Sequence, residues 1–270
     1  MFADDHARLT DVLSRRFGES LKVDEQLAGV GPLLRMASHS THRQWSPQPV
    51  PESTIRLLAA CALSAPSKSD LQQASIIDIR DPQQRQAINE LVPQFPWVPS
   101  APAFLVFCAD GHRIRSIFEH HATPFINEHL DQFFNAVVDG SLVMMNFMQA
   151  AETAGLACCP ISMIRNHPSR LDEILSLPQH VVPIAGLCLG YPQLGGRVVS
   201  RLPLSLTVHR DRYPESDVLG QVHAYDARRR TLENASPEAA SWSVSKRDQY
   251  ANLQRPDWGD YVRSKGFSTT

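Results

Sequence analysis

Two short segments of the chain combine hydroxyl groups with cationic side chains. They are residues 39–45 (HSTHRQW) and residues 64–72 (SAPSKSDLQ), and one short predicted helix separates them. Charge-assisted hydrogen bonds to phosphate are among the strongest that side chains form. Loops of this composition therefore suit an anionic ligand that also carries a sugar-like tail.

The chain contains none of the short signatures that commonly build nucleotide or hydrolase sites. It has no GxGxxG after a strand, no GxxxxGK followed by Ser or Thr, no HExxH and no GxSxG. The glycines at Gly190, Gly195 and Gly196 are too scattered for a dinucleotide fingerprint. A phosphate site in this chain must be built from side chains and loop amides rather than from a glycine-rich cradle.

Composition narrows the class of protein. The 270 residues are 43% hydrophobic and 20% charged, which fits one or two globular domains, and the net charge of −2 gives no sign of a nucleic-acid surface. No apolar run reaches the about 20 residues of a membrane span, and the early acids argue against a signal peptide. The odd number of cysteines, all in apolar stretches and without zinc spacing, predicts buried, reduced thiols in a cytoplasmic protein.

Strands and helices alternate along the sequence. Continuous apolar runs at 103–108 and 181–190 predict strands buried on both faces, and 74–79 and 156–161 are also typical of strands. Apolar periodicity and helix-end residues predict helices at 51–63, 81–92, 130–153, 169–176 and 220–232, and one or two more within 1–35. We interpret 113–127 and most of 215–257 as polar and irregular.

The longest helix, at 130–153, is apolar on nearly every side. Such a helix is buried all round, in a core or at a subunit interface, and its methionines Met144, Met145 and Met148 belong there too. Because helices outweigh a small sheet, the pattern favours a three-layer α+β domain over a doubly wound fold.

The order of these motifs resembles that of the FMN-dependent nitroreductase and flavin reductase family, most closely its oxygen-insensitive NADPH nitroreductase branch. Residues 39–45 resemble the family's H/R-R-S-x-R-x-F motif, and residues 64–72 resemble its A-P-S-x-x-N-x-Q. Residues 178–192 (PQHVVPIAGLCLGYP) are the closest local match. The following Arg201-Leu202-Pro203 resembles a phosphate-binding R-L-P.

This resemblance implies a three-layer fold, with helices flanking a central mixed, mostly antiparallel sheet, and an intertwined homodimer. It covers about residues 36–210, the expected FMN-binding core, and the C-terminal 260–267. Residues 1–35 would then form an N-terminal helical arm, and 211–270 a C-terminal extension with a mobile loop and a dimer-wrapping tail. Residues 137–139 resemble part of the central dimer helix.

The resemblance also implies contacts to FMN. Thr41 would bond the ribityl chain or the phosphate, and Arg43 would face the flavin pyrimidine at N1 and O2. There its positive charge would stabilise the reduced flavin. Ser67, Asp70 and Gln72 would hold the ribityl chain and the pyrimidine edge.

Further contacts implied by the resemblance involve the phosphate and the ring. His39 and Arg201 would reach the phosphate. Backbone amides near Ile161 and Ser162 would lie beside flavin N5, and Gln94 would approach the ring from the loop before the 103–108 strand.

The sequence departs from the family pattern at several positions. Ser40, within the predicted cofactor-binding motif, replaces its first arginine, and Asp70 stands where many relatives carry asparagine. Val199 replaces a lysine. Simpler roles also exist for the site residues: Arg43 and Arg201 as surface salt-bridge residues, and Thr41 and Ser67 as helix caps.

The activity implied by the resemblance is hydride transfer from NADPH or NADH through FMN to nitroaromatics, quinones or flavins. One pocket used in turn gives ping-pong kinetics, and no protein residue is needed as a general acid or base. The alternatives are a specialised flavoenzyme acting on one metabolite and a non-catalytic flavin-binding protein. Basic residues at 228–230 and 246–247 favour NADPH, although solvated helix faces explain them equally well.

Overall fold

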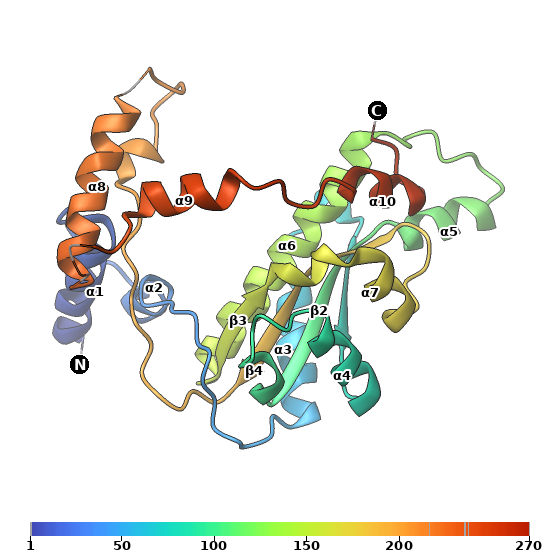
Figure 1. Cartoon of the computed structure of the whole chain (residues 1–270), viewed down its shortest axis with the longest axis horizontal. Coiled ribbons are helices and arrows are strands. Elements are labelled where there is room, and N and C mark those ends of the chain that lie inside the picture. Colours follow the sequence, from blue (N-terminus) through green and yellow to red (C-terminus); the bar gives the residue numbers. More distant parts are fainter. Residues whose placement is uncertain (1, 216, 235, 237, 270) are drawn as a thin grey trace. The chain divides into compact units, whose positions relative to one another are not determined.

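The computed structural model describes residues 2–215, 217–234, 236 and 238–269. The chain divides into two compact units, Met1–Ser40 with Gly196–Gln254 and Thr41–Gly195 with Arg255–Thr270. We call them unit 1 and unit 2 and describe each by itself. Unit 2 contains the sheet (Figure 1). The functional boundaries expected near residues 35 and 210 stay predictions.

The sheet of unit 2 has four strands in the order β1-β2-β4-β3. They are β1 (Ala74–Asp78), β2 (Ala103–Asp110), β3 (Ala157–Ile161) and β4 (Val181–Gly190). A mixed, mostly antiparallel sheet was expected, and each pairing between these described strands is antiparallel. The central strands β2 and β4 are almost wholly buried, as their continuous apolar sequences predicted.

Helices cover both faces of the sheet (Figure 1). One face carries α3 (Glu52–Leu63) and α6 (Leu130–Thr153), and the other carries α4 (Pro82–Glu90) and α7 (Pro168–Leu175). Alternate side chains of β2 serve the two layers, because successive residues of a strand point to opposite faces. Leu105 and Phe107 pack with α3 and α6, whereas Phe104 and Val106 pack on the opposite face. The three-layer α+β prediction is confirmed.

Two further helices belong to unit 2, α5 (His112–His120) and α10 (Trp258–Ser264). The prediction of an irregular segment at 113–127 was therefore wrong over α5. Its sequence is polar, and tertiary contacts support it: Arg115 is buried, pairs with Glu128 and lies over the rings of Phe125 and Phe267. A pattern based on apolar periodicity does not detect a helix that is held by a buried guanidinium.

Unit 1 is helical in its described residues. Its helices are α1 (Phe2–Phe17), α2 (Val30–Ala37), α8 (Val218–Leu232) and α9 (Trp242–Tyr250). One or two helices were predicted within residues 1–35, and two are present, although α2 continues to Ala37. Helix α9 was missed. The Ser241 hydroxyl caps α9, and Ser243 bonds to Asp226 of α8, so polar contacts define this helix.

Four of the five cysteines are buried as predicted, but Cys61 is exposed. Helix α3 turns Ile55, Leu58 and Ala62 into the core. Cys61 follows Leu57 at the i+4 position on the outer side, where Leu57 is also exposed. An apolar sequence context therefore did not bury this thiol.

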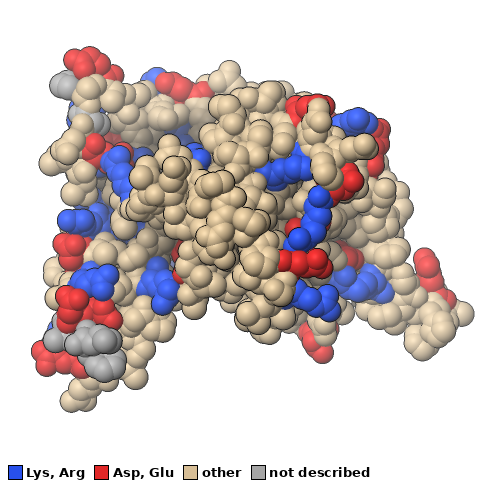
Figure 2. All heavy atoms as spheres, turned by 90° about the horizontal axis from the view of Figure 1, so that it is seen from below, with Lys and Arg blue, Asp and Glu red and all other residues tan. Residues whose placement is uncertain are grey.

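The surface carries both signs of charge. On the face in Figure 2, acidic and basic side chains lie interspersed, in keeping with the nearly balanced net charge of −2. None of the described helices has the length and apolar character needed to cross a bilayer.

Helix α6 lies close against the sheet at Gly140. A Cβ atom added here would lie 2.3 Å from Ile184 Cδ1 and 3.0 Å from the backbone oxygen of Cys108. The missing side chain therefore lets the helix backbone pack directly on β2. This approach brings the preceding residue, Asp139, within hydrogen-bond distance of the chain entering β1.

We predict that Gly140→Ala lowers the free energy of unfolding by about 1–3 kcal/mol, because the added methyl group overpacks this contact. Chemical denaturation of the purified protein measures the change. The neighbouring Ser141 is exposed, so Ser141→Ala is the matched control and should change stability by less than about 0.5 kcal/mol. Equal stability of the Gly140 variant and the native protein would contradict this account of the helix contact.

Candidate functional site

The loop before β1 is held by one buried carboxylate, that of Asp139, which is 2% exposed. Asp139 Oδ2 accepts hydrogen bonds from the Ser67 hydroxyl at 2.8 Å and the Gln73 amide at 3.1 Å, and Oδ1 accepts from the Lys68 amide at 2.9 Å. A buried carboxylate is stable only when donors surround it. Asp139 therefore fixes both ends of residues 67–73 to α6.

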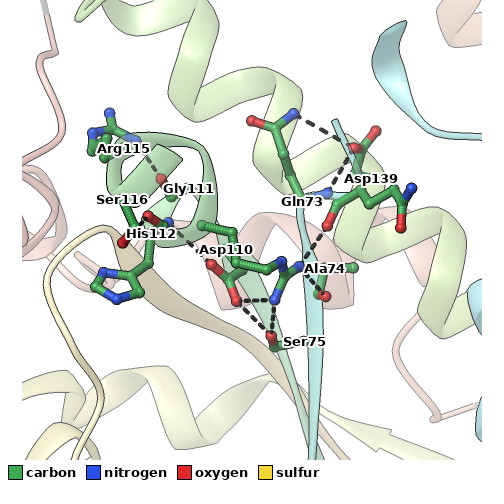
Figure 3. A network of polar contacts seen from close by, with 11 residues as sticks. Gln73, Ala74, Ser75, Asp110, Gly111, His112, Arg115, Ser116 and Asp139 are labelled. Carbon is green, nitrogen blue, oxygen red and sulfur yellow. Dashed lines mark hydrogen bonds and ion pairs between the residues drawn. The ribbon is translucent and has the colours of Figure 1, made fainter. Parts of the chain in front are cut away.

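The Arg113 guanidinium holds the far end of the same loop by donating to backbone carbonyl groups there. Arg113 of α5 donates to the carbonyl oxygens of Gln72 and of Ala74, the latter at 2.7 Å. Its other nitrogen contacts Asp110 at 2.6 Å and the Ser75 hydroxyl at 2.9 Å. Figure 3 shows Asp110 beside Ser75, and Asp139 reaching Gln73. The loop is thus anchored by charges of opposite sign, one binding its amides and the other its carbonyls.

The anchored loop has an unusual backbone. Ser69, Asp70 and Gln72 have φ values of 49°, 57° and 52°. These lie in the left-handed region, which residues other than glycine rarely adopt. Such conformations persist when surrounding contacts enforce them. Asp139 and Arg113 supply those contacts here.

Three predicted site residues come together on this loop. Ser67, Asp70 and Gln72 line one pocket of about 700 Å³, and Asp139 and Arg113 also belong to its lining. This volume lies within the about 300–1,000 Å³ of small-molecule sites. The Asp70 carboxylate accepts a hydrogen bond from the side-chain amide of Gln72 at 3.1 Å. Ser67 makes no helix-capping bond, so its hydroxyl serves the loop rather than a helix end.

The other cation-and-hydroxyl segment runs beside β3. The His42 amide donates to the Cys158 carbonyl at 3.1 Å, and the Trp45 indole donates to the Ala157 carbonyl at 3.3 Å. Trp45 also forms a β-bridge with Pro192. Thr41 and Arg43 are exposed on this segment.

The Arg43 guanidinium lies over the ring of Trp97, 5.6 Å from its centroid. Within the described part of the chain its side chain has no hydrogen bond or ion pair. The surface salt-bridge explanation therefore does not apply to Arg43 in this structure. Burial raises the pKa of the nearby Cys159 thiol to about 11, although the Arg43 charge acts in the opposite direction. The thiol stays protonated at neutral pH and does not neutralise the cation.

Three more predicted residues lie on elements that contact the Arg43 segment, namely β3 with the turn after it and the loop of Trp97. Gln94 is exposed on the loop that carries Trp97. Ile161 ends β3, and Ser162 begins a short 3-10 turn. Arg255, which the sequence analysis missed, donates to the Ser162 carbonyl at 3.3 Å and to Asn166 Oδ1 at 2.7 Å. A guanidinium therefore supports the turn expected beside the flavin.

The remaining predicted residues, His39, Ser40 and Arg201, belong to unit 1. Arg16, which is 6% exposed, links two of them: its side chain donates to the His39 carbonyl at 2.7 Å, and its own carbonyl accepts from the Arg201 amide at 2.6 Å. The two residues predicted to reach a phosphate are thus tied to the same arginine.

The basic residues considered for NADPH all have neighbours within unit 1. Arg228 bonds to the carbonyls of Phe17 and Arg201, and Arg229 pairs with Glu233 at 3.1 Å. On α9, Lys246 donates to Gln249 and Arg247 pairs with Asp248. Local contacts of this kind explain the cluster without a nucleotide.

The two groups of site residues in unit 2 lie at opposite ends of the sheet. The loop of residues 67–73 leads into Ala74, which pairs with Ala109 near the end of β2. The segment at 41–45 contacts Ala157 and Cys158, whose register on β4 corresponds to the start of β2. At about 3.3 Å per residue, the two groups are roughly 20 Å apart along the strands.

Sequence reasoning missed the residues that hold these groups in place. Asp139 was noted only within the segment that resembles the dimer helix, yet a carboxylate in the apolar middle of such a helix is itself a signal, since a buried charge needs partners. Arg113 and Trp97 carried no comparable signal, because their partners are distant in sequence.

We predict that Asp139→Ala lowers the free energy of unfolding by about 3 kcal/mol, since buried donors lose their acceptor. Amide hydrogen exchange should show faster exchange at Lys68 and Gln73 than in the native protein. Asp131→Ala is the control: Asp131 is exposed on the same helix, and its loss should cost less than about 1 kcal/mol. Unchanged protection of both amides in the Asp139 variant would refute the anchoring role.

Comparison with known proteins agrees with this architecture. The model of the Nitroreductase family matches residues 36–191, and that of the Nitroreductase family C-terminal domain matches residues 200–270. The FMN reductase (NAD(P)H) of Bacillus subtilis is 30% identical over 238 residues, which cover 86% of this chain and 96% of that protein. The oxygen-insensitive NADPH nitroreductase of Salmonella typhimurium is 31% identical over 236 residues, covering 87% and 97%.

A solved structure, the NADPH:FMN oxidoreductase from Vibrio harveyi complexed with NAD+, is similar in fold. It superposes with a TM-score of 0.80 at 27% identity and covers 88% of this chain and 98% of its own. The two family models together match most of the sequence, and the relatives are matched over nearly their whole length. The chain belongs to the nitroreductase family.

Proposed function

We propose that this protein is an FMN-dependent oxidoreductase that takes hydride from NADPH or NADH and reduces small acceptors such as nitroaromatics, quinones or flavins. The observation that carries the proposal is Arg43: an exposed cation, without an acidic partner among the described residues, on a segment that is hydrogen-bonded to β3. A cation left without a counter-ion is suited to a ligand that gains negative charge on reduction.

The donor set fits FMN. Arg43 would face the pyrimidine, and Thr41, on the same segment, would bond the ribityl chain or the phosphate. The hydroxyl and amide groups of Ser67 and Gln72 suit a ribityl chain and the edge of the ring. Asp70 stands where a carboxylate would oppose a reduced flavin, but its oxygen already accepts from Gln72, which limits this repulsion.

Other residues would contact the phosphate and the reactive edge of the flavin ring. His39 and Arg201, with Ser40 beside them, would bind the phosphate. The amides near Ile161 and Ser162 would lie beside N5, supported by Arg255, and Gln94 would approach the ring. When bound, FMN supplies the hydride acceptor and donor. The protein positions it, and no side chain is assigned as a general acid or base.

We also propose that the site is completed by a second copy of the chain. The Arg43 segment and the Ser67 loop lie at opposite ends of one sheet, so a ligand on one of them can meet the other only from a partner. The surface of α6 supports this. Its exposed apolar residues recur every three or four positions and form one stripe: Leu130, Phe134, Val138, Leu142 and Met145.

We propose that the enzyme is cytoplasmic. Four of its thiols are buried among apolar side chains, which is typical of proteins from reducing compartments. NADPH and NADH, the proposed donors, remain equally open, because the basic residues of α8 and α9 are engaged with neighbours.

We predict that the purified protein, loaded with FMN, shows a flavin absorption spectrum that NADPH or NADH bleaches without oxygen. A quinone or nitroaromatic should then restore the oxidised spectrum. Titration with each donor measures the preference. Bound FMN that neither donor bleaches would favour a non-catalytic flavin protein, and absence of binding would refute the proposed function.

We predict that Leu142→Asp, which places a charge in the apolar stripe, converts a dimer to a monomer and weakens FMN binding at least tenfold. Sedimentation measures the mass, and fluorescence titration measures FMN affinity. Ile126→Asp is the control, because Ile126 is 83% exposed and lies outside α6. Full FMN affinity in a monomeric variant would contradict a site shared between copies.

A further inference from the structure

The Arg43 side chain needs support, because a long exposed arginine samples many rotamers. Its one ring contact among the described residues is with Trp97. Trp97 is half-buried and packs against two more aromatic rings: Trp45, 6.0 Å between centroids, and Phe95, at 5.4 Å. We call Trp45, Phe95 and Trp97 the aromatic shelf.

The shelf is fixed to the fold at Trp45. Trp45 is 6% exposed, its indole donates to the Ala157 carbonyl on β3, and its backbone bridges to Pro192 after β4. Trp97 is therefore held against an element that belongs to the sheet. The surface under Arg43 does not depend on the rotamer of an exposed residue.

An aromatic face differs from a carboxylate as support for a cation. A carboxylate would hold the guanidinium but cancel its charge. The face of an indole attracts the cation through its quadrupole and leaves the net charge at +1. It also leaves the N–H groups at the rim of the guanidinium available to other acceptors.

We propose that Trp97 is a positioning residue that holds Arg43 toward the flavin pyrimidine without neutralising it, and so raises the affinity for reduced FMN more than that for oxidised FMN. This inference rests on the proposed function. The simplest competing role is structural, with Trp97 only filling space between Trp45 and Phe95. The two roles differ in what they do to the bound flavin.

The test is the reduction potential of bound FMN, measured by equilibration with a reference dye, together with FMN affinity and thermal stability. Trp97→Leu removes the ring face but keeps an apolar side chain. Loss of an exposed cation–π contact should weaken FMN affinity by about two- to fivefold. If only the affinity for reduced FMN falls, a fivefold loss corresponds to a reduction potential about 20 mV lower. Trp97→Phe keeps a weaker ring and should restore part of the shift.

A double-mutant cycle separates positioning from packing. Arg43→Gln should lower the potential by itself, and adding Trp97→Leu should then have little further effect, since the two residues act through one contact. Phe95→Leu is the packing control: it removes a ring from the shelf without a ring contact to Arg43, so it should lower the melting temperature and leave the potential unchanged.

The possible outcomes separate a failure of this inference from a failure of the proposed function. If the native protein does not bind FMN, both are refuted. If Arg43→Gln binds FMN with an unchanged potential, the assignment of Arg43 is wrong, and the inference fails with it. If Arg43→Gln lowers the potential but Trp97→Leu does not, Trp97 only fills space and the proposed function stands. A shift with Trp97→Leu that disappears in the Arg43→Gln background supports the inference.

Discussion

The buried carboxylate of Asp139 is the interaction on which the loop before β1 depends. Its oxygens gather the Ser67 hydroxyl and the amides of Lys68 and Gln73, and this contact is possible because Gly140 lets the helix backbone lie against β2. Three left-handed residues in the loop would otherwise relax to more favourable backbone angles. A glycine, a carboxylate and a strained loop therefore act together, and Asp139 and the loop line the pocket.

The two groups of site residues use charge in contrasting ways. The carboxylate of Asp139 is enclosed by donors and serves the protein itself. The guanidinium of Arg43 is exposed and rests on a ring that leaves its charge intact. The first arrangement fixes the shape of the loop, and the second leaves a positive electrostatic field available to a ligand. An enzyme whose reactive group is a bound cofactor needs both, since the protein's part is to place that group and to tune it.

The sequence was sufficient for the layers and for most elements. The strand at 181–190 and the helix at 130–153 were predicted with their observed bounds, because continuous apolar runs reflect burial directly. The family was also confirmed, since it depended on the order of several motifs. Helices α5 and α9 were missed because Arg115 and Ser241 hold them by polar contacts. Asp139 and Trp97 escaped notice for a related reason: their importance lies in partners that are remote along the chain, which spacing does not reveal.

The segment at 41–45 has a second consequence for the molecule. In the strand order, β3 lies at the edge of the sheet, where unpaired backbone groups can recruit another chain and start aggregation. The His42 amide donates to the Cys158 carbonyl of this edge strand, and the Trp45 indole donates to the neighbouring Ala157 carbonyl. The segment that carries the proposed binding cation thus also binds backbone groups at one end of an edge strand. A substitution in this segment can therefore change the solubility of the protein as well as its binding of a ligand.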